Sequence, residues 1–299
     1  MKPTSNPIDL FAVTIQAHLH RLHLQSPEPE RLVDFYVQTY GMHKCQVPTL
    51  AAVAPGRQVM ATSGVANQLH YFLYSLETDA AWSQFKQRAA QVPQAHQADM
   101  SAFAELPADA IGFRDPDGHC VVFASASALS EDALMSSSTY NTADQALPPA
   151  MTQHLGIRTP NIDAMVTFYS EVLGFVVSDR VHDDQGQLRA CFLRTSELHH
   201  ALALFGAPVS CFDHQSFEAP DWEGLKQWAD HMGDLRQEIV WGVGRHGPGN
   251  DVFFMVRDPD GNLAEISSEI EVCSADRPMG IWKHEERTLN LWGKAIMRS

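Results

Sequence analysis

The sequence is short of positive charge and has no long apolar run. Lys and Arg number 21 against 36 Asp and Glu, which gives a net charge of −15 and opposes binding to nucleic acid or anionic membranes. No segment supplies the ~20 apolar residues of a membrane span, and the first residues lack the charged leader and apolar core of a secretion signal. We therefore expect a cytoplasmic protein that has no nucleic-acid or membrane partner.

Cysteine is also scarce, and its pattern excludes two classes of site. The five cysteines lack CxxC spacing, and their odd number argues against a complete disulfide framework. We expect reduced and mostly buried thiols at Cys45, Cys120, Cys191, Cys211 and Cys273.

An internal repeat is the main feature that is present. Residues 21–42 match residues 154–175 without a gap, and residues 113–123 (FRDPDGHCVVF) resemble residues 256–266 (VRDPDGNLAEI). A chain of 299 residues is long enough for two domains of ordinary size. The halves are therefore interpreted as duplicates.

Each half divides again into a strand, a helix and a group of strands. In the second half, helical spacing of apolar residues follows a short strand at 154–160, and strands follow the helix. The same order begins again at residue 211, and the DPDG at 258–261 predicts a tight hairpin turn. The class is therefore α+β, built from four βαβββ units.

The domain boundaries follow from a polar stretch rich in small residues that ends in Pro-Pro, which is typical of a linker. We expect a first domain over 1–135, a linker over 136–150, a second domain over 151–272 and a tail over 273–299. The tail carries Trp282, Leu289, Leu291 and Trp292 among charges. It is interpreted as a segment packed on the second domain, a subunit contact or a lid.

This pattern of four units resembles the vicinal oxygen chelate superfamily, and within it the type I extradiol ring-cleavage dioxygenases. The resemblance covers roughly residues 15–270 and is most specific at 244–265, GRHGPGNDVFFMVRDPDGNLAE. It implies two domains, each a curved mixed β-sheet half-barrel with outer helices. It also implies a metal held by His154, His214 and Glu265. Met255 departs from the pattern, because the family usually has Tyr there.

The chemistry of these three residue types fits that use. Two imidazoles and one carboxylate are the ligands of non-heme Fe(II) oxygenases, because three coordination positions stay open for substrate and dioxygen. One residue from each of three strands can point into a shared concavity. Any one of the 15 His is more often a surface residue than a ligand, so the signature carries the prediction. We expect Fe(II), with Mn(II) as the alternative.

The duplicate half supplies an internal control. Arg21 corresponds to His154, Tyr71 to His214 and Val122 to Glu265, although His70 beside Tyr71 leaves that alignment open by one residue. The first half has lost the ligand types, so we expect one metal per chain, in the second domain.

Three further histidines are candidates for proton transfer. A catechol that chelates a metal through both oxygens must lose protons, and a neutral His suits that transfer. His199 and His200 are adjacent, so only one should face the cavity, and the resemblance favours His199. It also assigns His246 to hydrogen bonding near substrate and oxygen.

The expected reaction is O2-dependent cleavage of a small aromatic diol beside its two hydroxyls, and the resemblance also implies a homo-oligomer. Two other classes remain open. One is a glyoxalase-like isomerase or lyase using Zn or Ni, whose ligand set usually needs a residue from a paired unit. The other is a metal-free binding protein of the bleomycin-resistance kind. Which catechol is cleaved is left open, and Met255 predicts a reduced rate on simple catechol because a thioether cannot donate a hydrogen bond.

Overall fold

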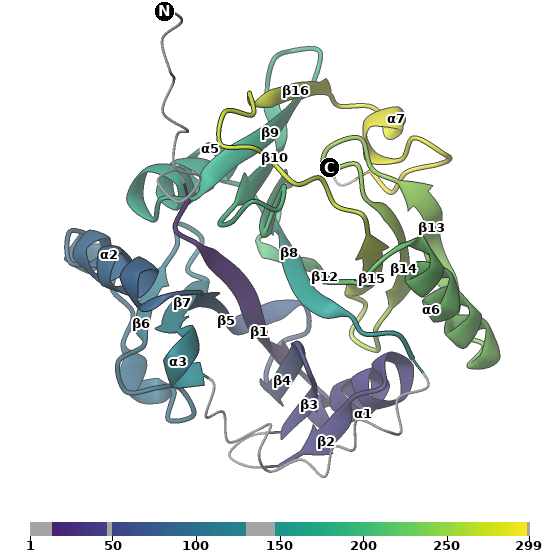
Figure 1. Cartoon of the computed structure of the whole chain (residues 1–299), viewed down its shortest axis with the longest axis horizontal. Coiled ribbons are helices and arrows are strands. Elements are labelled where there is room, and N and C mark those ends of the chain that lie inside the picture. Colours follow the sequence, from purple (N-terminus) through teal and green to yellow (C-terminus); the bar gives the residue numbers. More distant parts are fainter. Residues whose placement is uncertain (1–13, 47–49, 130–146, 298–299) are drawn as a thin grey trace, which may run out of the picture.

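The computed structural model describes residues 14–46, 50–129 and 147–297. Two mixed β-sheets form the interior, and helices α1, α2 and α6 lie on the outside (Figure 1). This confirms the α+β class. Most of the predicted linker, 136–150, lies outside the described residues, so its boundaries stay a prediction. None of the helices in the described ranges is long and apolar enough to cross a membrane.

The first half forms a seven-stranded sheet in the order β2-β3-β4-β1-β5-β7-β6. Its second unit has two strands after the helix, because two 3-10 turns occupy the chain between α2 and β6, so βαββ replaces the expected βαβββ. The elements are β1 (Ala17–Ser26), α1 (Pro29–Tyr40), β2 (His43–Cys45), β3 (Leu50–Ala54), β4 (Arg57–Ser63), β5 (Gln68–Leu76), α2 (Asp79–Ala89), β6 (Ile111–Arg114), β7 (Cys120–Ser125) and α3 (Ala126–Leu129).

The second half forms a nine-stranded sheet in the order β13-β14-β15-β12-β8-β11-β10-β9-β16. Strand β16 comes from the tail and pairs parallel to β9. The elements are β8 (Met151–Thr159), α5 (Ile162–Thr167) with a π-helical continuation (Phe168–Val172), β9 (Val176–His182), β10 (Leu188–Arg194), β11 (Leu202–Gly206), β12 (Cys211–Glu218), α6 (Trp222–Asp234), β13 (Ile239–Arg245), β14 (Val252–Arg257), β15 (Leu263–Ser268), β16 (Gly280–Lys283) and α7 (Glu286–Leu289).

Local sequence chemistry sets the ends of these elements. The Asp221 side chain caps α6 by accepting a hydrogen bond from the backbone N–H of Gly224 at 2.8 Å. In the predicted DPDG turn, Asp258 Oδ1 accepts from the N–H groups of Asp260 and Asn262, and Gly261 adopts φ +90°. The turn places β14 and β15 side by side, which matters because β15 carries Glu265.

The two halves interlock by a reciprocal contact. The hydroxyl of Tyr36 in the first half donates to Asp258 of the second half at 3.2 Å. The corresponding Tyr169 in the second half donates to Asp115 of the first half at 2.9 Å. The largest buried apolar cluster contains residues of both halves, so the sheets pack as one body. Four of the five cysteines are buried and Cys211 is half-buried, in agreement with the prediction of mostly buried cysteines.

Candidate metal centre

The three predicted ligands come together at the middle of the second sheet. His154 lies on β8, His214 on β12 and Glu265 on β15, three neighbouring strands. All three are buried. The two Nε2 atoms lie 3.1 Å apart, and His214 Nε2 lies 4.0 Å from Glu265 Oε2. One donor atom from each residue falls within 4.8 Å of the others, so the three can share one ion.

The other ring nitrogen of each imidazole has an acceptor beside it. Gln153 Oε1 lies 2.5 Å from His154 Nδ1, and Asp213 Oδ2 lies 2.7 Å from His214 Nδ1. Asp213 also accepts from Arg158 Nε at 2.6 Å. Because Nδ1 then carries the proton, Nε2 keeps a lone pair in the neutral ring. These residues therefore fit a divalent cation: two imidazole lone pairs and a carboxylate converge from one side.

Gln153 and Asp213 reach the rings because both strands are irregular at these positions. The pairing of β8 with β12 shifts between Ser216 and Phe217 and again between Phe212 and His214, so an adjacent residue turns to the same side as each ligand. Gly156, opposite His214, leaves room for its ring, because a Cβ at Gly156 would overlap the imidazole.

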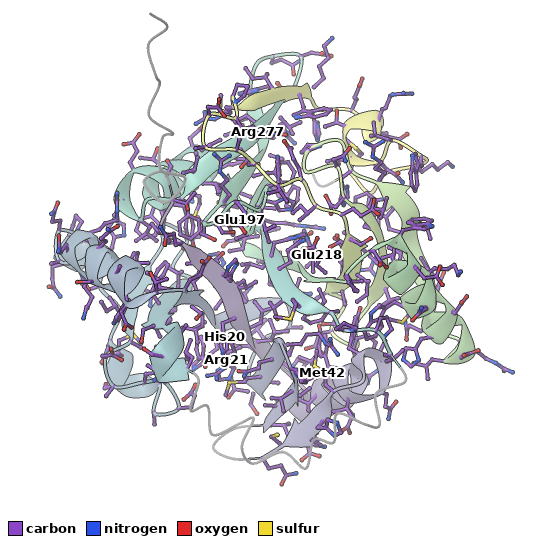
Figure 2. All side chains as sticks on the ribbon, viewed as in Figure 1. His20, Arg21, Met42, Glu197, Glu218 and Arg277 are labelled. Atoms are coloured by element: carbon purple, nitrogen blue, oxygen red, sulfur yellow. The ribbon has the colours of Figure 1, made fainter. Side chains whose placement is uncertain are left out.

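Strand register answers the question that the sequence left open about the first half. Gly156 pairs with His214 in the second sheet, and His23 pairs with Tyr71 in the first. Tyr71, and not His70, is therefore the counterpart of His214. Glu265 pairs with Ser216 in the second sheet, and Val122 pairs with Leu73, the counterpart of Ser216, in the first. Val122 is therefore the counterpart of Glu265. Arg21, labelled in Figure 2, pairs with Leu73 as His154 pairs with Ser216, so Arg21 is the counterpart of His154.

A small cavity opens beside the ligands. Its wall is mostly apolar and aromatic, with four histidines on it. The lining residues are His154, Phe192, His200, Ala203, Phe205, His214, Trp241, His246, Pro248, Met255 and Leu289.

The preference for His199 over His200 as the residue facing the cavity is wrong. His200 lines the cavity, and its ring lies 4.2 Å from that of His154, centroid to centroid. His199 is fully buried behind it, with Nε2 3.2 Å from Asp179 Oδ2. Adjacent residues point to opposite faces only within a strand, and β11 begins only at Leu202, so strand alternation does not fix the directions of the two side chains.

His246 lies on the same cavity wall, in an orientation set by two contacts. Its Nδ1 donates to the carbonyl of Leu289 at 2.6 Å, and its ring stacks on Phe253 with centroids 3.7 Å apart and an interplanar angle of 4°. Since Leu289 also lines the cavity, the tail both orients His246 and contributes to the cavity wall.

Sequence reasoning missed Asp251, which is fully buried beside the site. An oxygen of its carboxyl lies within 4.8 Å of His246 and Glu265 donor atoms. Burial raises the pKa of Asp251 to about 8, and the carboxylate of Glu218 adds to the effect. The position was visible as an acidic residue that opens the apolar strand VFFMV.

Met255 is buried and pairs with Glu265 across β14 and β15. It lines the cavity directly beside a predicted ligand. Whatever occupies the cavity therefore meets a thioether at the position where the resemblance expects a phenol.

Comparisons with known proteins support the resemblance. The family model described as "Glyoxalase/Bleomycin resistance protein/Dioxygenase superfamily" matches residues 152–266, a stretch that contains all three predicted ligands. Metapyrocatechase 2 from Cupriavidus necator is 30% identical over 154 residues, 51% of this chain and 47% of that protein. Biphenyl-2,3-diol 1,2-dioxygenase from Paraburkholderia xenovorans (strain LB400) is 27% identical over 143 residues, 46% of each chain. The matched stretch is thus about half the length of these relatives.

Solved structures share the fold over nearly the whole chain. Homoprotocatechuate 2,3-dioxygenase from Brevibacterium fuscum, in complex with 3,4-dihydroxyphenylacetate, has a TM-score of 0.72 at 21% identity, covering 96% of this chain and 92% of that one. A Mn(II)-bound glyoxalase from Novosphingobium aromaticivorans has a TM-score of 0.69 at 20% identity, covering 94% and 91%. The resemblance predicted from the signature at 244–265 is confirmed, because residues 152–266 match the model of the Glyoxalase/Bleomycin resistance protein/Dioxygenase superfamily.

Proposed function

We propose that this protein is an Fe(II)-dependent extradiol dioxygenase that uses O2 to open the ring of a catechol-type substrate beside its two hydroxyls. One observation carries the proposal. Two imidazole lone pairs and one carboxylate converge at one end of a cavity with aromatic walls, and His200 and His246 line the same cavity. The names of the relatives, metapyrocatechase and biphenyl-2,3-diol dioxygenase, agree with this reaction.

His154, His214 and Glu265 would hold the metal. When bound, Fe(II) supplies redox chemistry and open coordination positions for a bidentate diol. The ligand set supports Fe(II), and Mn(II) is the alternative. Metal analysis of the purified protein, with activity restored by one ion and not the other, distinguishes them.

The protein groups have separate roles in this proposal. His200 accepts a proton from a substrate hydroxyl, and burial lowers its pKa well below the usual value, with further lowering by His199, His246 and His214. A neutral ring is therefore available as a base at physiological pH. His246 hydrogen-bonds substrate or oxygen through Nε2. Phe192 and Trp241 exclude water from the ring.

The test is oxygen uptake by Fe(II)-loaded enzyme, prepared anaerobically, with a panel of substituted catechols and detection of yellow ring-opened product. We expect uptake with at least one catechol and its loss in Glu265→Gln. Glu223→Gln, an exposed carboxylate on α6, serves as the matched control. Absence of uptake across the whole panel refutes the proposal. Tight binding of an aromatic compound without metal would then favour the binding protein, and metal-dependent isomerisation would favour the glyoxalase-like enzyme. We also propose a cytoplasmic, homo-oligomeric protein, which gel filtration and fractionation test.

A further inference from the structure

A fully buried carboxylate lies behind the cavity wall. Asp179 on β9 accepts hydrogen bonds from Arg277 Nη1 at 2.8 Å, from the N–H of Gly280 at 3.0 Å and from Trp282 Nε1 at 2.7 Å. All three donors belong to the C-terminal segment, defined here as residues 271–282, and Arg277 lies beside β16 at the edge of the sheet (Figure 2). Burial alone would raise the pKa of Asp179, but hydrogen bonds from His199 and Arg277 outweigh it and lower the pKa to about 2. Asp179 is therefore ionised.

Asp179 connects to His200 through His199. His199 Nε2 lies 3.2 Å from Asp179 Oδ2, and His199 Nδ1 lies 3.0 Å from His200 Nδ1. Both histidines and Asp179 are buried. A neutral imidazole has one N–H and one lone pair. The nitrogen of His199 that carries the proton is therefore the donor, and the other nitrogen is the acceptor.

The carboxylate fixes this choice. Because an anion lies beside Nε2 of His199, the proton belongs there, and Nδ1 becomes an acceptor. His200 must then donate through its own Nδ1, which leaves the lone pair on its Nε2, the nitrogen on the far side of the ring. His200 is thereby prepared as a base.

The same C-terminal segment also holds the backbone of this pair. The N–H of His199 donates to the carbonyl of Glu271 at 2.9 Å, and the N–H of Cys273 donates to the carbonyl of Glu197 at 2.7 Å. Gly249 also packs against the histidines, since a Cβ there would lie 3.2 Å from His199 Nδ1 and from His200 Cε1. Other charged or titratable groups around the pair include His154, His214, His246, Asp251, Glu271 and Arg277.

We propose that Asp179 and His199 are positioning residues that fix His200 in the tautomer with its lone pair on Nε2, and that the C-terminal segment holds them in place. The role of His200 as a base rests on the proposed function, whereas its tautomer does not. The two adjacent histidines thus have different roles. His200 faces substrate, and His199 donates to Asp179 and accepts from His200.

Two substitutions of His199 separate this role from simple packing. His199→Phe keeps a ring but removes both the donor and the acceptor. His199→Gln loses the ring, yet its amide can still donate to Asp179 and accept from His200. We expect kcat to fall about 100-fold or more in His199→Phe with little change in KM, and to recover most of the loss in His199→Gln. A packing role predicts the opposite order, and that result would overturn the proposal. His182→Phe, on β9 but outside the cavity wall, should retain wild-type rates.

The tautomer itself is measured by long-range ¹H–¹⁵N NMR on the metal-free full chain with ¹⁵N-labelled histidine, using His200→Gln to assign the His200 signal. We expect a protonated Nδ1 and an unprotonated Nε2 on His200, and a mixture of tautomers in His199→Phe. Protonated Nε2 in the wild type, or an unchanged spectrum in His199→Phe, refutes the inference. This experiment needs no turnover, so it separates failure of the inference from failure of the dioxygenase proposal.

Discussion

Asp213→Asn is the sharpest test of the metal centre. Asp213 is buried and its two oxygens have different partners: Oδ2 accepts from His214 Nδ1 at 2.7 Å and Oδ1 accepts from Arg158 Nε at 2.6 Å. An amide has only one acceptor oxygen. If it faces His214, its NH2 meets the guanidinium donor; if it faces Arg158, its NH2 meets the imidazole N–H. One contact is therefore lost in either orientation, together with the negative charge.

We expect Asp213→Asn to weaken metal binding about 10- to 100-fold, which is the effect typical of losing such a partner of a ligating His and corresponds to about 1.4–2.7 kcal/mol. Anaerobic competition titrations with a chromophoric chelator measure the affinity for Fe(II) and Mn(II). Asp183→Asn, in the β9–β10 turn, is the matched control. An affinity within twofold of wild type in a folded Asp213→Asn protein would contradict the geometry on which the site is built.

Three further substitutions probe other parts of the site. Gly156→Ala places a methyl group against the His214 ring, so we expect at least tenfold weaker metal binding and a loss of about 1–3 kcal/mol in unfolding free energy. Gly233→Ala is the control, because a Cβ at this position on α6 meets open space. It should change neither the metal affinity nor the unfolding free energy. In the folded protein Asp251 stays a neutral acid up to pH about 8, whereas in the unfolded chain it ionises near pH 4, its ordinary value of about 3.9. The stability of the wild-type protein therefore decreases as the pH rises through this interval. The unfolding free energy of Asp251→Asn should therefore rise relative to that of the wild type by about 1.4 kcal/mol per pH unit. Urea unfolding of both metal-free proteins at pH 5 and 7 measures this difference. The same difference at both pH values would contradict the burial argument. Met255→Tyr adds a hydrogen-bond donor beside Glu265, so its kcat/KM on simple catechol should rise relative to that on substituted catechols. Met255→Leu should change these values little. Identical kinetics in the wild type and both variants would mean that residue 255 does not affect the choice of substrate.

The repeat and the signature at 244–265 were sufficient to predict the fold class and to bring His154, His214 and Glu265 together. The elements follow from hydrophobic periodicity, whereas the three residues came from the family resemblance, and the structure places their donor atoms within 4.8 Å of one another. The partners Gln153 and Asp213 could not be predicted in this way. They reach the rings through shifts in strand pairing, which no periodicity reveals.

The choice between His199 and His200 failed for a related reason. Residues before Leu202 lie outside β11, and the directions of their side chains depend on Asp179 and on the backbone of Glu271, both remote in sequence. The missing strand of the second unit and the added strand β16 likewise depend on tertiary packing. Local sequence predicts the elements well, but it does not predict contacts made across the sheet.

The buried Arg21 has a consequence for how each half responds to solution conditions. It stands at the position of a ligand, with its Nε donating to Gln58 at 2.7 Å, and Glu105 lies 3.5 Å from His23 nearby. The first half thus carries a central positive charge on one of its own side chains, whereas under the proposed function the second half takes a metal ion from the medium. That proposal predicts that chelators loosen hydrogen-exchange protection in β8, β12 and β15 and leave β1, β5 and β7 unchanged.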